Sequence, residues 1–373
     1  MPDFTIILLA AGNSTRFAQE VKKQWLRIDT KPLWQFVADR VAKQINAKDI
    51  IITAHPKEAQ YMRIHGDYTI VPGGDSRQES LKNALAYVTT PYVLVTDVAR
   101  ACVPDEMTRA IVAAKEKADI IVPYLPVSDT VVYRNETIER DEVKLIQTPQ
   151  LSRTEVLQKA LQSKTLYTDD SSAVKAVGGT VFYIKGSINA KKITVYDDLA
   201  LLPCLKAPAK TTLTGIGFDV HRFCSDKQMV LGGVEIDSEL GFEAHSDGDV
   251  ALHALIDALL GAAGAGDIGE LYPDTDIANK DIDSKVMLAE VVTFIRNTGF
   301  EISNVDITIM AQAPKLSPYK EKMRQTIASV LKIAPVCVNI KATTTEKLGF
   351  VGRKEGVAVE AVASLQYYNW KRI

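Results

Sequence analysis

The chain has 373 residues with a formal net charge of −2, and it is 46% hydrophobic and 24% charged. These values are typical of a globular protein with two or three domains, and they exclude a strongly basic surface that would attract nucleic acid or an anionic membrane. No apolar run reaches the ~18 residues that a membrane span needs, and the first residues lack the basic segment of a signal peptide, so we expect a cytoplasmic protein.

Short apolar runs alternate with helix-length segments in the first half of the chain. The apolar runs are residues 4–10, 50–53, 92–95 and 119–122, and the helix-length segments include residues 33–44 and 80–88. A continuous apolar run is typical of a strand buried on both faces of a parallel sheet. The pattern predicts an open α/β sheet, which binds ligands at the carboxyl ends of its strands.

Loops of small and charged residues follow these predicted strands. Residues 10–17 (Ala-Ala-Gly-Asn-Ser-Thr-Arg-Phe) would let a phosphate chain approach the backbone, with Arg16 and Lys23 adding charge. An ordinary strand-to-helix turn and a solvated basic patch explain the same residues equally well. Residues 73–80 form a glycine-rich turn before a helix, and Asp97 ends a strand where a magnesium ion on a triphosphate could be held.

Together these motifs resemble 2-C-methyl-D-erythritol 4-phosphate cytidylyltransferase, a family of Rossmann-like nucleotidyltransferases, over residues 1 to about 205. Several motifs in the right order are more specific than any one of them. The matching residues are 9–12 with Arg16, 23–24, 73–75 with Arg77 and Ser80, Asp97 with Arg100, 148–150, Lys192 with Thr194, and 198–201.

The resemblance implies in-line attack of methylerythritol 4-phosphate on the α-phosphorus of CTP, with release of pyrophosphate. Arg16 and Lys23 would stabilise the triphosphate, and Asp97 would bind magnesium. Arg140 and Lys192 would hold the sugar phosphate, with Arg140 reaching across a dimer. The residues expected around the cytidine are Ala10, Ala11, Gly12, Gly74, Asp75 and Ser80.

The first half departs from the family pattern at a few positions. The first loop has Ser14 and Thr15 where the family usually has glycine and arginine, and Lys22 stands where it usually has proline. Val98 and Ala101 replace an alanine and a proline near Asp97. Because Arg16, Lys23 and Asp97 are present, we expect activity.

A short segment with little periodicity separates the two halves. We predict a first domain over residues 1–205, a linker over 206–211 and a second domain over 212–373. The four cysteines are scattered and show no metal-ligand spacing, so we expect them to be reduced and packed in the core. They are Cys102, Cys204, Cys224 and Cys337.

Three of the five histidines lie within residues 221–253. Asp219 and His221 would point to the same face of a strand, and His253 falls in an apolar helical run that could dock on it. One carboxylate and two imidazoles suit a catalytic zinc ion with an open position. From spacing alone, a hydrogen-bonded core histidine and a turn aspartate remain an alternative.

The rest of the second half predicts an α+β domain. Residues 284–298 and 319–331 have helical patterns, whereas residues 305–310, 338–343 and 356–364 have strand patterns. Four motifs resemble 2-C-methyl-D-erythritol 2,4-cyclodiphosphate synthase over residues 212–373. They are residues 218–221, 244–253, 311–315 and 341–350.

This second resemblance implies that Asp219, His221 and His253 bind zinc or a similar divalent ion, and that Glu346 binds magnesium or manganese on the substrate diphosphate. His245 and Thr344 would stabilise the transition state, and we hypothesise that Asp257 steadies the metal ligands. Other expected binding residues, some at a trimer interface or its central cavity, are Ser246, Asp267, Ile268, Gly269, Tyr272, Asp274, Asp276, Ala311, Lys315, Thr343, Thr345, Phe350, Arg353 and Glu355.

Both halves thus resemble enzymes of the methylerythritol phosphate route to isoprenoid precursors. The two steps are not consecutive, because a kinase acts between them. A dimer-forming half joined to a trimer-forming half closes most simply as a hexamer. In the alternative interpretation, the first half uses another acceptor or binds nucleotide without catalysis.

Overall fold

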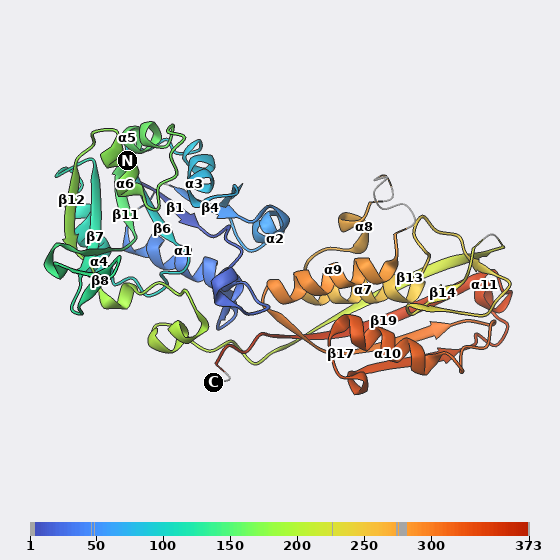
Figure 1. Cartoon of the computed structure of the whole chain (residues 1–373). Helices are drawn as coiled ribbons and strands as arrows, with labels where there is room; N and C mark the ends of the chain where they lie inside the picture. The colour runs from blue at the N-terminus through green and yellow to red at the C-terminus, as the bar shows by residue number, and fades with distance from the viewer. Residues whose placement is uncertain are drawn as a thin grey trace. The chain divides into compact units, whose positions relative to one another are not determined.

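The computed structural model describes residues 4–45, 47, 49–225, 227–273, 275 and 282–371. The chain divides into two compact units, Met1–Ala207 and Pro208–Ile373, which run from blue to yellow-green and from yellow-green to red in Figure 1. This division falls within residues 206–211, the predicted linker. None of the helices in the described part of the chain has the length and apolarity for crossing a membrane.

The first unit is built on an eight-stranded mixed sheet of order β10-β7-β11-β6-β1-β4-β5, with β12 beside β7. The strands β6, β1, β4 and β5 are parallel to one another, so their carboxyl ends share one edge. The antiparallel strand β11 separates β6 from β7. The strands are β1 (Phe4–Leu9), β4 (Asp49–Ala54), β5 (Thr69–Pro72), β6 (Tyr92–Asp97), β7 (Ile120–Pro126), β10 (Lys144–Ile146), β11 (Gln150–Arg153) and β12 (Val181–Lys185).

Helices cover both faces of this sheet. Successive side chains of a strand point to opposite faces, and apolar side chains on both faces need to be covered. Ile7 and Leu9 of β1 lie in a core cluster with Leu81 of α3, Leu157 of α5 and Val174 of α6. Their neighbours on β1 face α1 and the adjoining α4, on the other side. The helices are α1 (Leu33–Gln44), α2 (Ala59–Arg63), α3 (Arg77–Leu85), α4 (Asp105–Ala113), α5 (Thr154–Ala160) and α6 (Asp170–Ala176).

Short elements complete the first unit. Helix α3 begins earlier than its apolar pattern predicts, because the Ser76 hydroxyl accepts a hydrogen bond from the Glu79 N–H at 3.0 Å and caps the helix. The short strands are β2 (Arg27–Ile28), β3 (Lys31–Pro32), β8 (Val131–Tyr133) and β9 (Glu136–Ile138), and the 3-10 helices include η1 (Thr15–Phe17), η2 (Lys23–Trp25), η3 (Pro56–Glu58), η4 (Arg140–Glu142), η5 (Ile188–Ala190) and η6 (Tyr196–Leu201).

The second unit is a five-stranded sheet of order β16-β13-β19-β17-β18 with its long helices on one face. On the other face Ile216, Phe218 and Val220 of β13 are exposed. The strands are β13 (Thr212–Cys224), β14 (Val230–Leu231), β15 (Val234–Glu235), β16 (Gly241–Phe242), β17 (Phe300–Met310), β18 (Val338–Thr343) and β19 (Gly356–Tyr367); the helices are α7 (Val250–Ala263), α8 (Ile268–Leu271), α9 (Ser284–Asn297), α10 (Lys320–Leu331) and α11 (Gly349–Gly352), with the 3-10 helix η8 (Pro335–Cys337).

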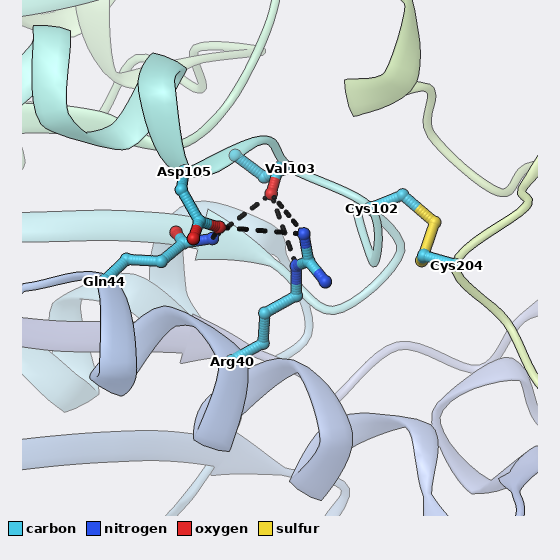
Figure 2. Close-up of a disulfide and its surroundings, with 6 residues drawn as sticks. All are labelled: Arg40, Gln44, Cys102, Val103, Asp105 and Cys204. Atoms are coloured by element: carbon cyan, nitrogen blue, oxygen red, sulfur yellow. Dashed lines mark hydrogen bonds and ion pairs between the residues drawn. A yellow bond between two sulfur atoms is a disulfide. The ribbon is translucent and has the colours of Figure 1, made fainter.

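The prediction that all four cysteines are reduced is wrong for one pair. Cys102 and Cys204 form a disulfide, as Figure 2 shows. Their Cα atoms are 5.7 Å apart. A separation of 102 residues leaves no local motif, and only the sheet topology brings the loop after β6 to the end of the first unit. Beside the bond, Arg40 and Gln44 of α1 donate to the carbonyl of Val103, so this loop is fixed on both sides.

Candidate functional site

The first unit holds a cavity of about 720 Å³ at the carboxyl ends of β1, β4, β5 and β6. Arg16, Lys23, Asp97 and Lys192 all line it, although they come from four separate segments. The residues predicted around the cytidine also line it, except Ala10, whose N–H donates to Thr53 Oγ1 at 3.2 Å. Those that line the cavity are Ala11, Gly12, Gly74, Asp75 and Ser80.

Asp97 is buried in the wall of this cavity and is surrounded by cations. Lys192 Nζ donates to Asp97 Oδ2 at 2.6 Å, and Arg77 Nε lies 3.5 Å from Oδ1. Burial would raise the pKa of Asp97, but the charges of Lys192, Arg77 and Arg100 outweigh it and hold the pKa below its usual range. The carboxylate therefore stays ionised and can hold a cation or a positively charged side chain.

Lys23 projects into the same cavity from η2. Its Nζ donates to the Ile193 carbonyl at 3.0 Å. Burial, together with the charges of Lys192 and Arg16, lowers its pKa to about 8. Three cations that repel one another in a concave site form a field suited to a polyanion such as a triphosphate.

The departures near the first loop have local partners. Lys22 does not point into the loop; its ammonium pairs with the buried carboxylate of Glu58. Ser14 has a left-handed backbone (φ 55°), a conformation that favours glycine, and its Oγ accepts from the Lys23 N–H at 3.1 Å. Gln24 Nε2 donates to the Gly12 carbonyl at 3.0 Å and so closes the loop.

Other residues were either placed elsewhere or not foreseen. Arg140 is exposed on η4 outside the cavity, where it donates to the Ser128 carbonyl at 2.8 Å. Two nitrogens of Arg77 donate to Asp170 at 2.6 and 3.2 Å, and Asp170 was not in the predicted site. His55 also lines the cavity. Its position just after β4 is the signal that could have identified it, because the carboxyl ends of parallel strands hold ligands.

In the second unit, Asp219, His221 and His253 form a cluster whose ligand atoms lie within 4.8 Å of one another. Asp219 Oδ2 lies 3.2 Å from His221 Nε2 and 3.3 Å from His253 Nδ1. Glycines on β13 allow this approach, since a Cβ at Gly217 would lie 1.9 Å from the Ala254 carbonyl oxygen of α7. The helix therefore packs directly on the strand backbone and brings His253 beside the two strand ligands.

Hydrogen bonds orient both imidazoles toward Asp219. His221 Nδ1 lies 2.9 Å from the Gly248 carbonyl, so this nitrogen carries the proton and Nε2 is left as a ligand. His253 Nε2 lies 3.0 Å from Ser284 Oγ, which itself donates to Asp247 at 2.5 Å. Because the serine proton is engaged, Ser284 accepts from His253 Nε2–H and leaves Nδ1 as a ligand.

The cluster has the chemistry of a divalent metal site. Burial would raise the pKa of Asp219, but the hydrogen bonds and charge that His221 and His253 supply when protonated hold it well below its usual range. One carboxylate oxygen and two imidazole nitrogens suit zinc. Asp257 accepts from the Ile268 N–H at 2.8 Å and so holds the loop after α7, while its proposed support of the metal ligands stays a prediction.

The remaining predicted residues lie on loops and edges of the second unit. The ends of β17 and β18 are joined by a bond from the Ala311 N–H to the Thr343 carbonyl at 3.0 Å, and Thr344 Oγ1 donates to Glu346 at 2.8 Å. Among the described residues, Glu346 is not part of the Asp219 cluster. Ser246 Oγ lies 3.3 Å from His253 Nε2.

Several of these residues are exposed or serve local structure. His245, Lys315 and Gly269 are exposed, and Thr345 and Ile268 are half-buried. Asp267 caps α8, and Tyr272 donates to Glu290 at 2.8 Å. Phe350 is exposed, and Arg353 donates to Glu355 at 2.8 Å. Asp274 and Asp276 lie outside the described residues.

Comparison with protein families divides the chain into the same two parts. Residues 4–205 match the model of 2-C-methyl-D-erythritol 4-phosphate cytidylyltransferase, and residues 212–366 match the model of the YgbB family. The two matches together cover nearly the whole chain.

Curated and solved relatives match both halves in one chain. The chain is 57% identical over 372 residues to "Bifunctional enzyme IspD/IspF" of Sulfurovum sp. (strain NBC37-1) and 54% identical over 373 residues to that of Aliarcobacter butzleri (strain RM4018), with 100% of each chain covered. A solved structure, "Structure of the Bifunctional IspDF from Campylobacter jejuni", has a TM-score of 0.90 and 45% identity, covering 99% of this chain and 100% of that chain.

Proposed function

Because this chain belongs to the family of bifunctional IspD/IspF enzymes, we propose the following roles for its two sites. It is a cytidylyltransferase and a cyclodiphosphate synthase of the methylerythritol phosphate pathway. The cytidylyltransferase transfers CMP from CTP to 2-C-methyl-D-erythritol 4-phosphate and releases pyrophosphate. The synthase converts 4-diphosphocytidyl-2-C-methyl-D-erythritol 2-phosphate to 2-C-methyl-D-erythritol 2,4-cyclodiphosphate and releases CMP.

In cytidyl transfer, the residues of the first cavity position two anions and neutralise them. A phosphate oxygen of the acceptor forms a bond to the α-phosphorus of CTP while the bond to pyrophosphate breaks. Arg16 and Lys23, which line the cavity, stabilise the negative charge on the triphosphate. Gly12, Gly74 and Asp75 bring backbone and side-chain groups to the cytidine.

Lys192 holds the acceptor phosphate, and Arg140 contributes from the partner of a dimer. The Asp97–Lys192 pair, 2.6 Å apart, keeps both charges compensated in the free enzyme. Asp97 would hold the magnesium ion that accompanies CTP and reduces the charge repulsion between the two phosphates. The acceptor phosphate then competes for the Lys192 ammonium.

In the synthase, Asp219, His221 and His253 would hold a zinc ion, which supplies Lewis-acid polarisation of a phosphate oxygen. The 2-phosphate oxygen forms a bond to the diphosphate phosphorus next to methylerythritol, and CMP leaves. His245 and Thr344 donate to the charge that develops, and Lys315 pairs with the diphosphate. Glu346, beside Thr344, would hold a magnesium or manganese ion on the diphosphate.

The residues proposed to bind the two metal ions of the second site lie in separate places, which supports an assembly in which subunits share the site. Glu346 is not a member of the Asp219 cluster among the described residues, and Ile216 and Phe218 expose 65% and 58% of their surface on the helix-free face of the sheet. We infer a trimer that covers this face, and a dimer through the first unit. The two symmetries close as a hexamer.

The observation that carries the proposal is the convergence of Arg16, Lys23, Asp97 and Lys192 on one cavity. The test measures pyrophosphate release from CTP, with and without methylerythritol 4-phosphate, and CMP release from the synthase substrate. Lys23→Ala should abolish only pyrophosphate release, and His253→Ala should abolish only CMP release. Pyrophosphate release that persists in Lys23→Ala, or that does not need the sugar phosphate, would contradict the proposed roles.

A further inference from the structure

The charged form of Lys23 is electrostatically unfavourable at its position in the cavity. Its ammonium shares the cavity with Arg16 and Lys192, and their charges, together with burial, lower its pKa to about 8. Its ammonium hydrogen bond to protein is to a neutral carbonyl, that of Ile193 at 3.0 Å. Like charges push such a side chain toward solvent, so the backbone of η2 has to be held firmly for the ammonium to stay directed into the cavity.

A buried ion pair holds η2 on one side. Lys22, the residue before η2, pairs with Glu58, and their side chains are 13% and 4% exposed. The second oxygen of Glu58 accepts from Trp25 Nε1 at 2.7 Å, so one carboxylate holds both ends of the three-residue turn. Trp25 is itself fully buried, which leaves the turn little freedom to shift.

A serine holds η2 on the other side. Ser14 Oγ accepts from the Lys23 N–H at 3.1 Å and donates to Gln24 Oε1 at 3.1 Å. Ser14 makes these bonds from a left-handed backbone with φ 55°, which costs a side-chain-bearing residue more than it costs glycine. A glycine would relieve this strain but could not make either bond.

We propose that Lys22 and Ser14 are positioning residues for cytidyl transfer, which fix η2 from two sides and keep the Lys23 ammonium directed at the triphosphate of CTP. The inference rests on the proposed role of Lys23. Lys22 is not among the residues that line the cavity. Ser14 lines it, but its hydroxyl is engaged by the Lys23 N–H and by Gln24. Lys22 acts through Glu58 and the backbone, and Ser14 acts through the backbone N–H of Lys23.

The experiment compares full-length variants in the pyrophosphate-release assay. Lys22→Met removes the ion pair, and Ser14→Gly removes both serine bonds while it relieves backbone strain. We expect each to lower kcat/KM for CTP by about 5–30-fold, the effect of one or two lost contacts, with the KM for methylerythritol 4-phosphate unchanged. Lys22→Arg keeps the charge opposite Glu58 and should retain most of the activity.

The pH profile separates positioning from general structural damage. Burial is the largest cause of the lowered pKa of Lys23. Of the charged groups that face it, Lys192 and Arg16 lower the pKa more than Asp97 and Asp198 raise it. If η2 loosens, the ammonium moves away from these cations and its pKa rises toward the ordinary value of 10.5. The alkaline limb of kcat/KM for CTP should therefore move from about pH 8 to higher pH in Lys22→Met and Ser14→Gly.

Three controls keep the proposal falsifiable. Lys31→Met breaks the ion pair between Lys31 of β3 and Asp39 of α1. It should change neither the activity nor the pH profile. Lys22→Met combined with Glu58→Gln removes both buried charges, and it should still show the shifted profile if Lys22→Met alone does not fold. CMP release in each variant reports the intact second unit.

The outcomes distinguish the role of Lys23 from the positioning roles of Lys22 and Ser14. Pyrophosphate release that survives Lys23→Ala would refute the role of Lys23 itself. An inactive Lys23→Ala together with a wild-type kcat/KM and pH profile in Ser14→Gly and Lys22→Met would refute positioning alone. Equal losses in Lys31→Met and Lys22→Met would also overturn it, because they would indicate a nonspecific effect of losing a lysine.

Discussion

At the scale of single residues, we expect the charge on Lys23 to set the pH range of cytidyl transfer. Its pKa is lowered to about 8, so the ammonium is fully formed below that pH and is lost as the pH rises through it. A bound triphosphate favours the charged form of Lys23. The pKa of Lys23 in the free enzyme therefore governs the pH dependence of kcat/KM for CTP. We therefore expect the Lys23 charge to affect capture of CTP more than the later steps.

We predict that kcat/KM for CTP falls above about pH 8, tenfold for each pH unit at the limit, while kcat falls at a higher pH. Lys23→Arg should lose activity overall but keep a flat alkaline limb, because a guanidinium does not titrate there. The measurement is initial pyrophosphate release between pH 6 and pH 10 at constant ionic strength, roughly the range in which lysine and histidine titrate. An alkaline limb that persists unchanged in Lys23→Arg would assign the titration to another group.

A second residue-scale prediction concerns the proposed zinc ligand His253. Ser284 Oγ, 3.0 Å from His253 Nε2, fixes which ring nitrogen faces Asp219. Ser284→Ala should weaken zinc binding by about 10–100-fold, as is usual for such orienting partners. Zinc retained against a competing chelator measures this, and excess zinc should restore CMP release.

Thr293→Ala is the matched control for Ser284→Ala. Thr293 lies on the same helix, α9, and its hydroxyl donates only to the Ala289 carbonyl of that helix at 2.8 Å. Zinc retention should not change in this variant. Equal zinc retention by wild type and Ser284→Ala would show that the serine does not orient His253.

At the scale of elements, the contact between β13 and α7 places the metal ligands. We predict that Gly217→Ala pushes the helix away from the strand, because the added Cβ would meet the Ala254 carbonyl oxygen at 1.9 Å. Overpacking of this kind costs about 1–3 kcal/mol, and here it also separates His253 from Asp219. Zinc content and CMP release should fall together, while pyrophosphate release persists.

Gly261→Ala tests the same interface without the clash. A Cβ at Gly261, on α7, would lie 3.9 Å from its nearest neighbour, which is ordinary contact distance. Zinc content and CMP release should stay at the wild-type level. Loss of both in Gly261→Ala would mean that the interface is sensitive to any substitution.

The fold class was predictable from local sequence patterns, and the metal cluster was predictable from such patterns together with the family resemblance. Asp219 and His221 are two residues apart, so the period of a strand put them on one face. For His253, spacing alone left a core histidine as an alternative, and the family resemblance favoured the metal cluster. The family resemblance predicted the bifunctional assignment, which the comparisons confirm. Local patterns suffice wherever the chemistry lies on one element or on sequential neighbours.

Contacts between distant loops were not predictable in this way. The Lys22–Glu58 pair, the Arg77–Asp170 pair and the Cys102–Cys204 disulfide join segments 36, 93 and 102 residues apart. Each depends on which strands are neighbours in the sheet, and strand order is not encoded by the hydrophobic period of any one strand. The mixed part of the sheet, where β11 runs antiparallel between β6 and β7, escaped prediction for the same reason.

At the scale of the whole molecule, the exposed face of β13 is the surface on which we propose trimer formation. We predict that Ile216→Glu, at a side chain 65% exposed on that face, lowers the oligomer mass measured by light scattering. CMP release should fall with the mass, because the proposed synthase site is shared between subunits. Pyrophosphate release should be affected much less.

Val336→Glu is the control for Ile216→Glu. Val336 is 85% exposed in the same unit but lies on η8, away from β13 in the sequence and in the sheet order. The same new charge there should leave mass and CMP release unchanged. An unchanged mass in Ile216→Glu would exclude this face as the subunit contact.

The Cys102–Cys204 bond closes about half of the cytidyl-transfer unit, residues 102–204, into a covalent ring. Lys192 lies inside the ring and Asp97 lies just before it, so the ion pair between them links the ring to the amino-terminal half of the unit. A protease that cuts the ring once would leave a nicked unit whose two pieces stay joined through sulfur. Such a protein would migrate as one species on a gel without reductant and as two with it, and its catalytic charges would still belong to one covalent body.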